Sequence, residues 1–495
     1  MATAWPLLML IAIPVLAGLG SLWSRDRRLV EALQCGQAGI LVSAALLVVE
    51  RVVTEGEASV APLLRADAMS AWMDLLLGTV GGTGTLYAVG YLGEELDRGR
   101  VSMRRYGQFF CLFDLYLAAM LAAVNVENVA IMWIAVEGST LSAALLIGFE
   151  RKKAALEAGW KYVILSSVGI ALALFGTILV YYSSEHVLGV TSEALRWSEL
   201  YRVAETLDPN AIKAAFVFVL IGYGTKAGVA PMHTWLPDAH AEAPTPVSAM
   251  LSANMLAVAV YAILRFKAVV DRTVGSSFSG TLMVGLGLLS VAVAAVFLLV
   301  QRDYKRLFAY SSIEHIGITL IGFGLGGAGV FAALWHLLNH ALAKSAAFYA
   351  SGLVLLRHEH KMLDRVPGLL RQMPLAGGAI LVAGVALSGM PPFGLFVSEV
   401  LIAIGAYAAT PGVAYGFLSL LTLAFATLLY QVLRMTLGEP LEAGTALGSR
   451  NQTFMSAAIW LNLAALGTIG LQVPARCGTL LGSIAQLFGG TVEAP

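Results

Sequence analysis

The sequence predicts an all-α, polytopic membrane protein with about fourteen transmembrane helices. Its 495 residues are 58% hydrophobic and only 13% charged, whereas soluble proteins carry roughly a quarter charged residues. Apolar runs of about 20 residues recur along the chain, and each is long enough to cross a bilayer as a helix. Two of these runs are interrupted by glycine and proline at corresponding places, which indicates an internal repeat.

The composition also excludes several classes of function. The 31 Lys and Arg residues balance the 31 Asp and Glu residues, so no basic surface points to nucleic acid. The three cysteines are scattered and provide neither a disulfide framework nor the spacing of a metal or cluster site. We therefore expect no cofactor in this chain, and any redox cofactor must lie on other subunits.

The apolar runs define the expected helices. The first lacks the basic region and the cleavage site of a signal peptide, so we interpret it as a membrane helix. The longest connection, 183–210, is acidic and is expected to form a short surface helix. The runs are centred near Ala12, Leu41, Val80, Leu117, Ala135, Ala171, Phe218, Ala257, Val291, Leu320, Tyr349, Gly384, Leu420 and Leu463.

The distribution of basic residues predicts the orientation. When the loops are assigned alternately to two sides, most of the 31 Lys and Arg residues fall on one side. The positive-inside rule places that side in the cytoplasm. Both termini are then expected outside, for a multi-pass protein of the bacterial inner membrane.

The two interrupted runs divide the chain. One breaks at 228–231 and the other at 389–394, and such a pair points to inverted repeats with a site near the midplane. We place the repeats at 108–268 and 277–434. Residues 1–107 form the N-terminal membrane helices, and residues 435–495 contain a C-terminal membrane helix.

Lys226 lies well inside an apolar run that Pro231 breaks five residues later. A charge at that depth is costly and normally faces a protein interior, and irregular backbone there must be buried or line a cavity. The pattern indicates an ion path; the alternative is a lysine that snorkels to the interface. In the polar stretch that follows, His233 and His240 either feed protons to Lys226 or only fix the turn. The loose spacing of that stretch argues against a metal site.

Four further ionisable residues lie within apolar runs. Glu137 is about ten residues from either polar flank, so a carboxylate there should have a partner; a purely structural ion pair is the alternative. His336, His340 and Lys344 recur every four residues, which stacks them on one face of a helix. Each histidine alone is equally consistent with a satisfied core residue, but the row of three favours a proton relay.

Several motifs carry a family resemblance. They are GTKAGVAPMHTWLPDAHAEAPTPVSAML, DYKRLFAYSSIEHIG, HLLNHALAKSAAFY and GMPPFGLFVSE. They resemble the antiporter-like membrane subunits of respiratory complex I and related complexes. The form HAEAPTPVSAML most resembles component F of the hydrogenase-4 and formate hydrogenlyase complexes, and slightly less the M-type subunit of complex I.

The resemblance implies roles for these residues. It implies two inverted five-helix repeats, each with a broken helix, and a pair formed by Glu137 on the fifth helix and Lys226 on the seventh. It also places the histidine and lysine pattern of the eleventh helix in a central polar axis. Glu399 follows the second break and would be the terminal proton site, where other antiporter-like subunits have a lysine. The alternative for Glu399 is a carboxylate that caps the second half-helix.

The chain departs from this pattern in its eighth helix. Many related subunits have a lysine at the position of Ala257. Asn254 lies one turn earlier on the same face, and its amide can order a water molecule. We therefore expect Asn254, with Ser252, to support a hydrated bridge from Lys226 toward His336 and His340.

A last group of ionisable residues is expected in a loop and a helix start, with a solvated or subunit-contacting role. These residues are Asp303, Lys305, Arg306, Glu314 and His315. Asp114 is embedded in an apolar run, and the sequence assigns it no role.

These observations predict a proton-translocating membrane subunit of an energy-converting redox complex. Its partners would be other membrane subunits and a hydrophilic redox module. The first alternative is a subunit of a multisubunit sodium/proton antiporter, and the second is a non-translocating membrane scaffold. An enzyme acting alone is disfavoured, because the sequence contains no nucleophile motif, metal motif or nucleotide-binding loop.

Overall fold

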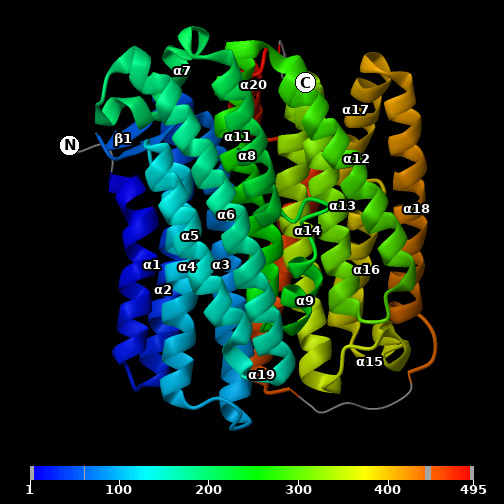
Figure 1. The fold of residues 1–495 in the computed structure, drawn as a ribbon. Helices are drawn as coiled ribbons and strands as arrows, with labels where there is room; N and C mark the ends of the chain where they lie inside the picture. The colour runs from blue at the N-terminus through cyan, green and yellow to red at the C-terminus, as the bar shows by residue number, and fades with distance from the viewer. Residues whose placement is uncertain (1–4, 61, 441–446, 491–495) are drawn as a thin grey trace.

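The computed structural model describes residues 5–60, 62–440 and 447–490 and is built almost entirely of helices that run along one axis (Figure 1). Ten helices of the described residues are long and apolar enough to cross a membrane. They are α1 (Trp5–Trp23), α2 (Arg27–Glu55), α3 (Ala68–Asp97), α4 (Met103–Asn125), α5 (Val129–Ile147, with the short η1, Gly148–Glu150), α6 (Lys153–Leu188), α10 to α11 (Thr245–Val274), α12 (Ser276–Val300), α18 (Pro411–Thr436) and α19 (Ser449–Leu471).

The other four expected segments are also helical, but they are shorter, more polar or broken. They are α8 (Pro209–Ala227), α13 (Tyr304–Leu325), α14 (Ala328–His358) and the pair α16 (Pro374–Leu387) and α17 (Gly394–Ala409). α13 and α14 carry histidine, lysine and glutamate among buried residues, which lowers their apolar character without exposing them. The predicted fold class, with about fourteen membrane helices, is confirmed.

Two breaks occur where the sequence placed them. α8 ends at Ala227, and Gly228 adopts a left-handed conformation with φ of 74° before the chain turns into the short α9 (Trp235–Glu242). α16 ends at Leu387, and Gly389 has φ of 65° before α17 begins. A positive φ favours glycine because a Cβ atom clashes there, so both glycines stop a helix within the membrane-spanning region.

The first break is held by hydrogen bonds from neighbouring elements. The indole Nε1 of Trp235 donates to the carbonyl oxygen of Thr225 at 2.8 Å, and the backbone N–H of Ala230 donates to Ser290 Oγ on α12 at 3.0 Å. These contacts satisfy backbone groups that the broken helix leaves open. The irregular backbone therefore stays buried in protein, as it must at membrane depth.

The central element is the continuous helix α10 to α11. It consists of α10 (Thr245–Met250), a π-helical turn (Leu251–Met255) and α11 (Leu256–Val274), and its apolar stretch is entirely buried inside the molecule. α11 packs against α8 and α12, and the π-helical turn packs against α14 and α3. In Figure 1, α1 and α2 lie on one side, α17 and α18 lie on the other, and α8 and α11 lie between them.

The sequence did not predict several short elements. The strands β1 (Ala58–Val60) and β2 (Leu64–Ala66) form an antiparallel pair in the α2–α3 connection. Residues 435–495 were expected to hold one helix, but α20 (Ala475–Leu487) follows α19. The connection 183–210 does contain a short helix, as expected: α7 (Trp197–Arg202), flanked by η2 (Ser192–Leu195) and η3 (Ala204–Thr206). The remaining small helices are η5 (Leu363–Arg365) and α15 (Leu369–Gln372).

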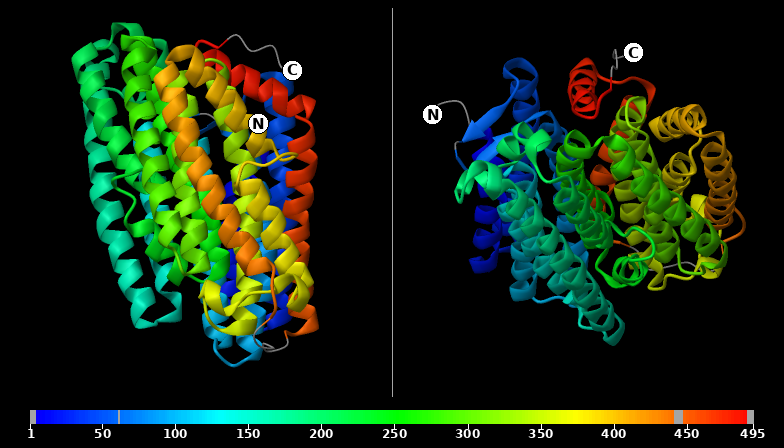
Figure 2. Two further views of the ribbon diagram at one scale, coloured as in Figure 1. Left: turned by 90° about the vertical axis from the view of Figure 1, so that its right-hand side faces the viewer. Right: turned by 45° about the horizontal axis from the view of Figure 1, so that its top comes forward.

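The ends of the described chain lie at the same end of the molecule, as Figures 1 and 2 show. The opposite end carries the α3–α4 connection and α15, where many of the basic residues gather. This arrangement agrees with an even number of membrane crossings. The assignment of that basic end to the cytoplasm and the repeat boundaries at 108–268 and 277–434 stay predictions.

Candidate proton pathway

Lys226 lies inside the protein, one residue before α8 ends. Its side chain is 1% exposed, and its Nζ donates a hydrogen bond to Thr140 Oγ1 on α5. The ammonium group also lies 6.0 Å from the centre of the Tyr162 ring on α6. A buried ammonium group with a hydroxyl and an aromatic face as neighbours does not snorkel, so the alternative of an interfacial lysine is disfavoured.

Glu137 lies on α5 one turn before Thr140, and therefore on the same face of the helix. Within the described residues it makes no ion pair with Lys226 closer than 4.0 Å, so the direct pair implied by the resemblance is not formed in this structure. Its side chain is only partly buried, and the buried oxygen Oε2 has no protein hydrogen-bond partner. Thr140, which accepts the hydrogen bond of Lys226, is thus one turn from Glu137 on the same helix.

His336, His340 and Lys344 all lie in the interior on α14, as their spacing predicted. Each is at most 1% exposed. His336 Nδ1 lies 2.8 Å from Ser398 Oγ on α17, and Lys344 Nζ donates to the carbonyl oxygen of Phe308 at 2.7 Å. Within the described residues, both ring nitrogens of His340 lack a protein partner.

His315 belongs to this cluster, and its sequence-based placement in a solvated helix start was wrong. Its Nδ1 lies 3.0 Å from His336 Nε2, and its ring centre is 5.0 Å from that of His340. Asp303 caps α13 by accepting hydrogen bonds from the backbone of Lys305 and Arg306. The helix then continues through Glu314 and His315, which are 2% and 0% exposed because α14 and α17 cover them.

Glu399 completes the cluster on α17. It follows Ser398 and is 5% exposed, and a carboxylate oxygen lies within 4.8 Å of ring nitrogens of His315 and His336. Its carboxylate rests against Gly389 in the second helix break, since a Cβ atom on that glycine would lie 2.0 Å from Glu399 Oε2. Three such groups are able to ligate a metal ion. The hydrogen bonds among His315, His336 and Ser398 equally suit proton transfer.

Glu399 also borders a hollow between α17 and α18. The cavity has a volume of about 650 Å³ and is lined by Ser388, Gly389, Tyr407 and apolar side chains of both helices. Glu399 therefore lies where the histidine cluster meets a mainly apolar hollow between α17 and α18.

The π-helical turn is linked to Lys344 by a short chain of hydrogen bonds. Ser252 Oγ lies 2.8 Å from Ser312 Oγ on α13, and Ser312 Oγ donates to the carbonyl oxygen of Phe308 at 3.0 Å. That same carbonyl accepts the bond from Lys344. The hydroxyl chain of Ser252 and Ser312 thus ends at a carbonyl oxygen that also accepts from Lys344. A carbonyl has no proton to pass on, so this contact brings the hydroxyls close to Lys344 without itself completing a relay.

Asn254 and Ala257 lie on the same central helix and are both fully buried. Asn254 Nδ2 approaches Met250 Sδ at 3.6 Å, and its Oδ1 has no protein partner. Met255, in the same turn, accepts a hydrogen bond from Tyr162 Oη at 3.3 Å. The turn therefore contacts the surroundings of Lys226 through Tyr162 and those of Lys344 through Ser252.

His240 and Lys305 lie near the basic end of the molecule, and both are fully buried. His240 Nδ1 is 2.8 Å from the carbonyl oxygen of Leu236, while Nε2 has no protein partner. Lys305 Nζ donates to the carbonyl oxygen of Ala243 at 2.7 Å, directly after α9. The expected solvated role of Lys305 was wrong, because α9 packs against α13 and the Ala243 carbonyl covers this ammonium group.

Lys305 forms part of the wall of a polar cavity of about 700 Å³. Charged groups line it, including Glu95, Glu150, Glu242 and Lys361. Lys361 Nζ bonds to Glu242 Oε1 at 2.7 Å and to the carbonyl oxygen of Ala241 at 3.0 Å. His233 is 9% exposed, lies in the turn between α8 and α9, and has an unpartnered Nδ1.

Two further buried carboxylates lie away from this row. Asp114, to which the sequence assigned no role, accepts hydrogen bonds from Gln34 at 2.7 Å and from Gln37 at 3.0 Å. Asp74, which sequence reasoning missed, accepts a bond from Asn125 Nδ2 at 2.7 Å. Both connect N-terminal helices, so their contacts are consistent with helix packing.

Comparisons with known proteins place this geometry in a family. Residues 126–425 match the family described as the transmembrane region of NADH:quinone oxidoreductase and Mrp antiporters. The chain is also 41% identical over 376 residues to a hydrogenase-4 component F homolog of Methylacidiphilum infernorum, covering 76% of this chain and 79% of that protein. The chain belongs to the NADH:quinone oxidoreductase/Mrp antiporter membrane family.

Other members of this family differ in length. Hydrogenase-4 component B of Escherichia coli is 30% identical over 350 residues, which cover 68% of this chain and 50% of that protein. The chain thus spans about half the length of component B. The resemblance drawn from the motifs is confirmed, including the hydrogenase-4 branch.

Solved structures share the fold. A chain of the Mrp complex from a Dietzia species superposes with a TM-score of 0.85 at 22% identity, covering 97% of both chains. A chain of respiratory complex I from Thermus thermophilus gives a TM-score of 0.74 at 24% identity, covering 94% of this chain and 97% of that one. At these identities the likeness establishes the fold alone.

Proposed function

We propose that this protein translocates protons as an antiporter-like membrane subunit of an energy-converting redox complex of the hydrogenase-4 or complex I type. One observation carries the proposal: buried ionisable side chains form a row through the protein interior from Lys226 to Glu399. An ionised group at the bilayer centre costs about 3 kcal/mol even on permissive scales. A scaffold has no need for such a row, whereas a proton path requires it.

The proposed route consists of an entrance, a first exchange site, a connecting turn and an output half. Protons enter through the polar cavity at the basic end, which Lys305 and His240 separate from the interior. Glu137 and Lys226 form the first exchange site, together with Thr140, the hydrogen-bond acceptor of Lys226. The π-helical turn then connects this site to the second half of the protein. In this turn, Ser252 and Asn254 take over the role of the lysine that related subunits have at the position of Ala257.

The output half consists of Lys344, the three histidines and Glu399. Imidazole is able to donate and accept protons near neutral pH, and the His315–His336 distance of 3.0 Å is short enough for direct transfer. Buried ring nitrogens without protein partners are normally satisfied by ordered water, which would connect His340 to its neighbours. Glu399 is the terminal group because it faces the hollow between α17 and α18.

The proposal includes partners and an orientation. The related structures are multisubunit membrane complexes, so we infer that this chain assembles with other membrane subunits and with a hydrophilic redox module. The basic end would face the cytoplasm of a bacterial inner membrane, so that protons enter there and leave on the side of both termini.

The test is pumping by the purified complex that contains this chain, reconstituted in vesicles. Electron transfer should acidify one side of the vesicle membrane, and Glu399→Gln should abolish most of this acidification while assembly is retained. Replacing sodium by potassium should leave pumping unchanged. A strict sodium requirement without any redox dependence would instead identify a sodium/proton antiporter subunit. Normal pumping by Glu399→Gln would remove Glu399 from the route.

A further inference from the structure

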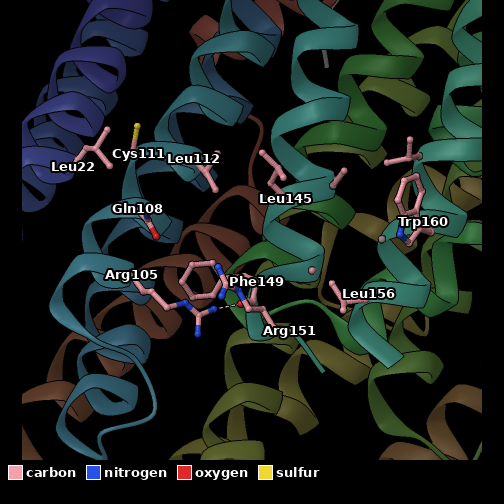
Figure 3. A pocket seen from close by; sticks show the side chains of 14 residues that line it. Leu22, Arg105, Gln108, Cys111, Leu112, Leu145, Phe149, Arg151, Leu156 and Trp160 are labelled. Atoms are coloured by element: carbon pink, nitrogen blue, oxygen red, sulfur yellow. Dashed lines mark hydrogen bonds between the residues drawn. The ribbon is translucent and has the colours of Figure 1, made fainter. Parts of the chain in front are cut away.

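A groove next to the polar entry cavity lies where α5 ends, and Arg105 and Phe149 border both. α5 stops at Ile147, and η1 turns the chain back into α6, so the space beside this turn is open between α1, α4 and α6 (Figure 3). The cavity has a volume of about 630 Å³, which is in the range of roughly 300–1,000 Å³ typical of small-molecule sites. Most of its wall is apolar and includes Leu112, Leu145, Leu156 and Val163.

Two arginines stand at one end of this groove. Arg105 on α4 places its guanidinium 4.5 Å from the centre of the Phe149 ring and donates to the Phe149 carbonyl oxygen. Arg151 directly follows η1 and is exposed. Figure 3 shows both guanidinium groups at the same end of the groove, below its apolar wall.

Neither arginine is neutralised by a carboxylate. Within the described residues, neither forms an ion pair closer than 4.0 Å. Two positive charges side by side repel each other, and the Glu150 carboxylate nearby is already paired with Lys152 at 2.6 Å. The end of the groove is therefore prepared for an anionic group.

Trp160 marks the level of the groove in the membrane. Its side chain is 67% exposed and forms part of the groove wall, and tryptophan is enriched at membrane–water interfaces. The arginines thus lie at headgroup level, and the apolar wall extends from them toward the hydrocarbon. Basic pockets between membrane helices bind anionic lipid headgroups.

We propose that this groove binds an anionic phospholipid. Its phosphate lies between Arg105 and Arg151 and accepts hydrogen bonds from both guanidiniums, and its acyl chains follow the apolar wall past Trp160. A free phosphate would leave this wall uncovered, and an apolar helix of a neighbouring subunit would leave the two arginines without an anion. An anionic lipid complements both features.

The test uses quenching of Trp160 by brominated lipids in nanodiscs that contain the assembled complex. The difference between the wild-type protein and Trp160→Phe isolates the fluorescence of this tryptophan. Brominated phosphatidylglycerol should quench it at a lower mole fraction than brominated phosphatidylcholine. The double variant Arg105→Gln/Arg151→Gln should lose about 25-fold of this preference, about fivefold for each arginine.

The matched control removes two charges at the same end of the protein but outside the groove. Arg104 and Lys153 are exposed and do not line the cavity, so Arg104→Gln/Lys153→Gln should keep the preference. Arg151→Lys should keep it as well, because the charge is retained. Equal quenching by both lipids, or equal losses in the two double variants, would overturn the proposal. The absence of quenching by either lipid would also overturn it, because a protein chain would then fill the groove.

Discussion

Gly389→Ala should impair proton translocation without changing any ionisable group. The added Cβ would lie 2.0 Å from Glu399 Oε2, whereas real Cβ atoms essentially never approach a neighbour closer than 3.0 Å. The carboxylate must therefore move by at least about 1 Å, the difference between these two distances. A displacement of that size in a reacting group lowers rates by on the order of a hundredfold.

The fold should survive this change. The clashing atom is the end of a flexible side chain, which is able to rotate away, and the left-handed backbone at Gly389 adds a cost of only about 1–2 kcal/mol for alanine. The complex should therefore assemble and transfer electrons, but pump poorly.

The assay measures the initial rate of pH-gradient formation in reconstituted vesicles, divided by the rate of electron transfer. Gly378→Ala is the matched control, because this glycine lies on α16, the helix that ends just before Gly389, and an added Cβ there meets no atom within 4 Å. Gly378→Ala should pump normally. The reasoning is refuted if Gly389→Ala also pumps normally while its structure shows a displaced carboxylate.

Changes elsewhere along the route give three further expectations, each read from the same pumping assay. Glu137→Gln and Lys226→Met should each abolish most pumping, and the double variant should lose no more than either alone, because groups that act as a unit are non-additive; independent, multiplying losses would contradict this. Ser312→Ala breaks a hydroxyl contact worth about 1 kcal/mol and should slow pumping several-fold. Asn254→Leu should slow pumping by a similar factor. Normal pumping rates in both variants would exclude the bridge through the π-helical turn. Lys305→Met should slow proton entry while the complex still assembles, and an unchanged initial rate would remove Lys305 from the route.

Much of the fold follows from the sequence because membrane helices are long and apolar. The fourteen expected centres all fall on helices, and both breaks were visible as glycine and proline in apolar runs. The pair β1 and β2 was missed because its strands have three residues each and make little pattern. The helix α20 was missed because its 13 residues are too few to span a membrane.

The candidate site was harder to predict than the fold. The row on α14 was visible because three ionisable residues share one helix face. His315 was missed because its role depends on contacts between α13, α14 and α17, which are distant in sequence. Asp303 could have revealed the burial of His315, because an aspartate of this kind marks the start of a helix. A helix that begins there and continues for more than twenty residues places position 315 near its centre.

The link between the two halves illustrates the same limit. Asn254 was expected to carry it, and the structure confirms that this side chain is buried. The hydrogen bonds from this turn, however, run through Ser252 and Ser312. The π-helical turn changes the direction of these side chains by adding a residue to one turn, and simple helical spacing does not anticipate that change.

The most direct measurement of the central claim is the number of protons pumped per electron by the reconstituted complex with Lys344→Met. Lys344 lies between the hydroxyl chain and the histidine cluster, so every proton on the proposed route must pass it. The substitution keeps a long side chain and removes the charge. The account predicts that electron transfer continues while the proton-to-electron ratio falls by the full share of this subunit. An unchanged ratio in a correctly assembled complex would contradict it.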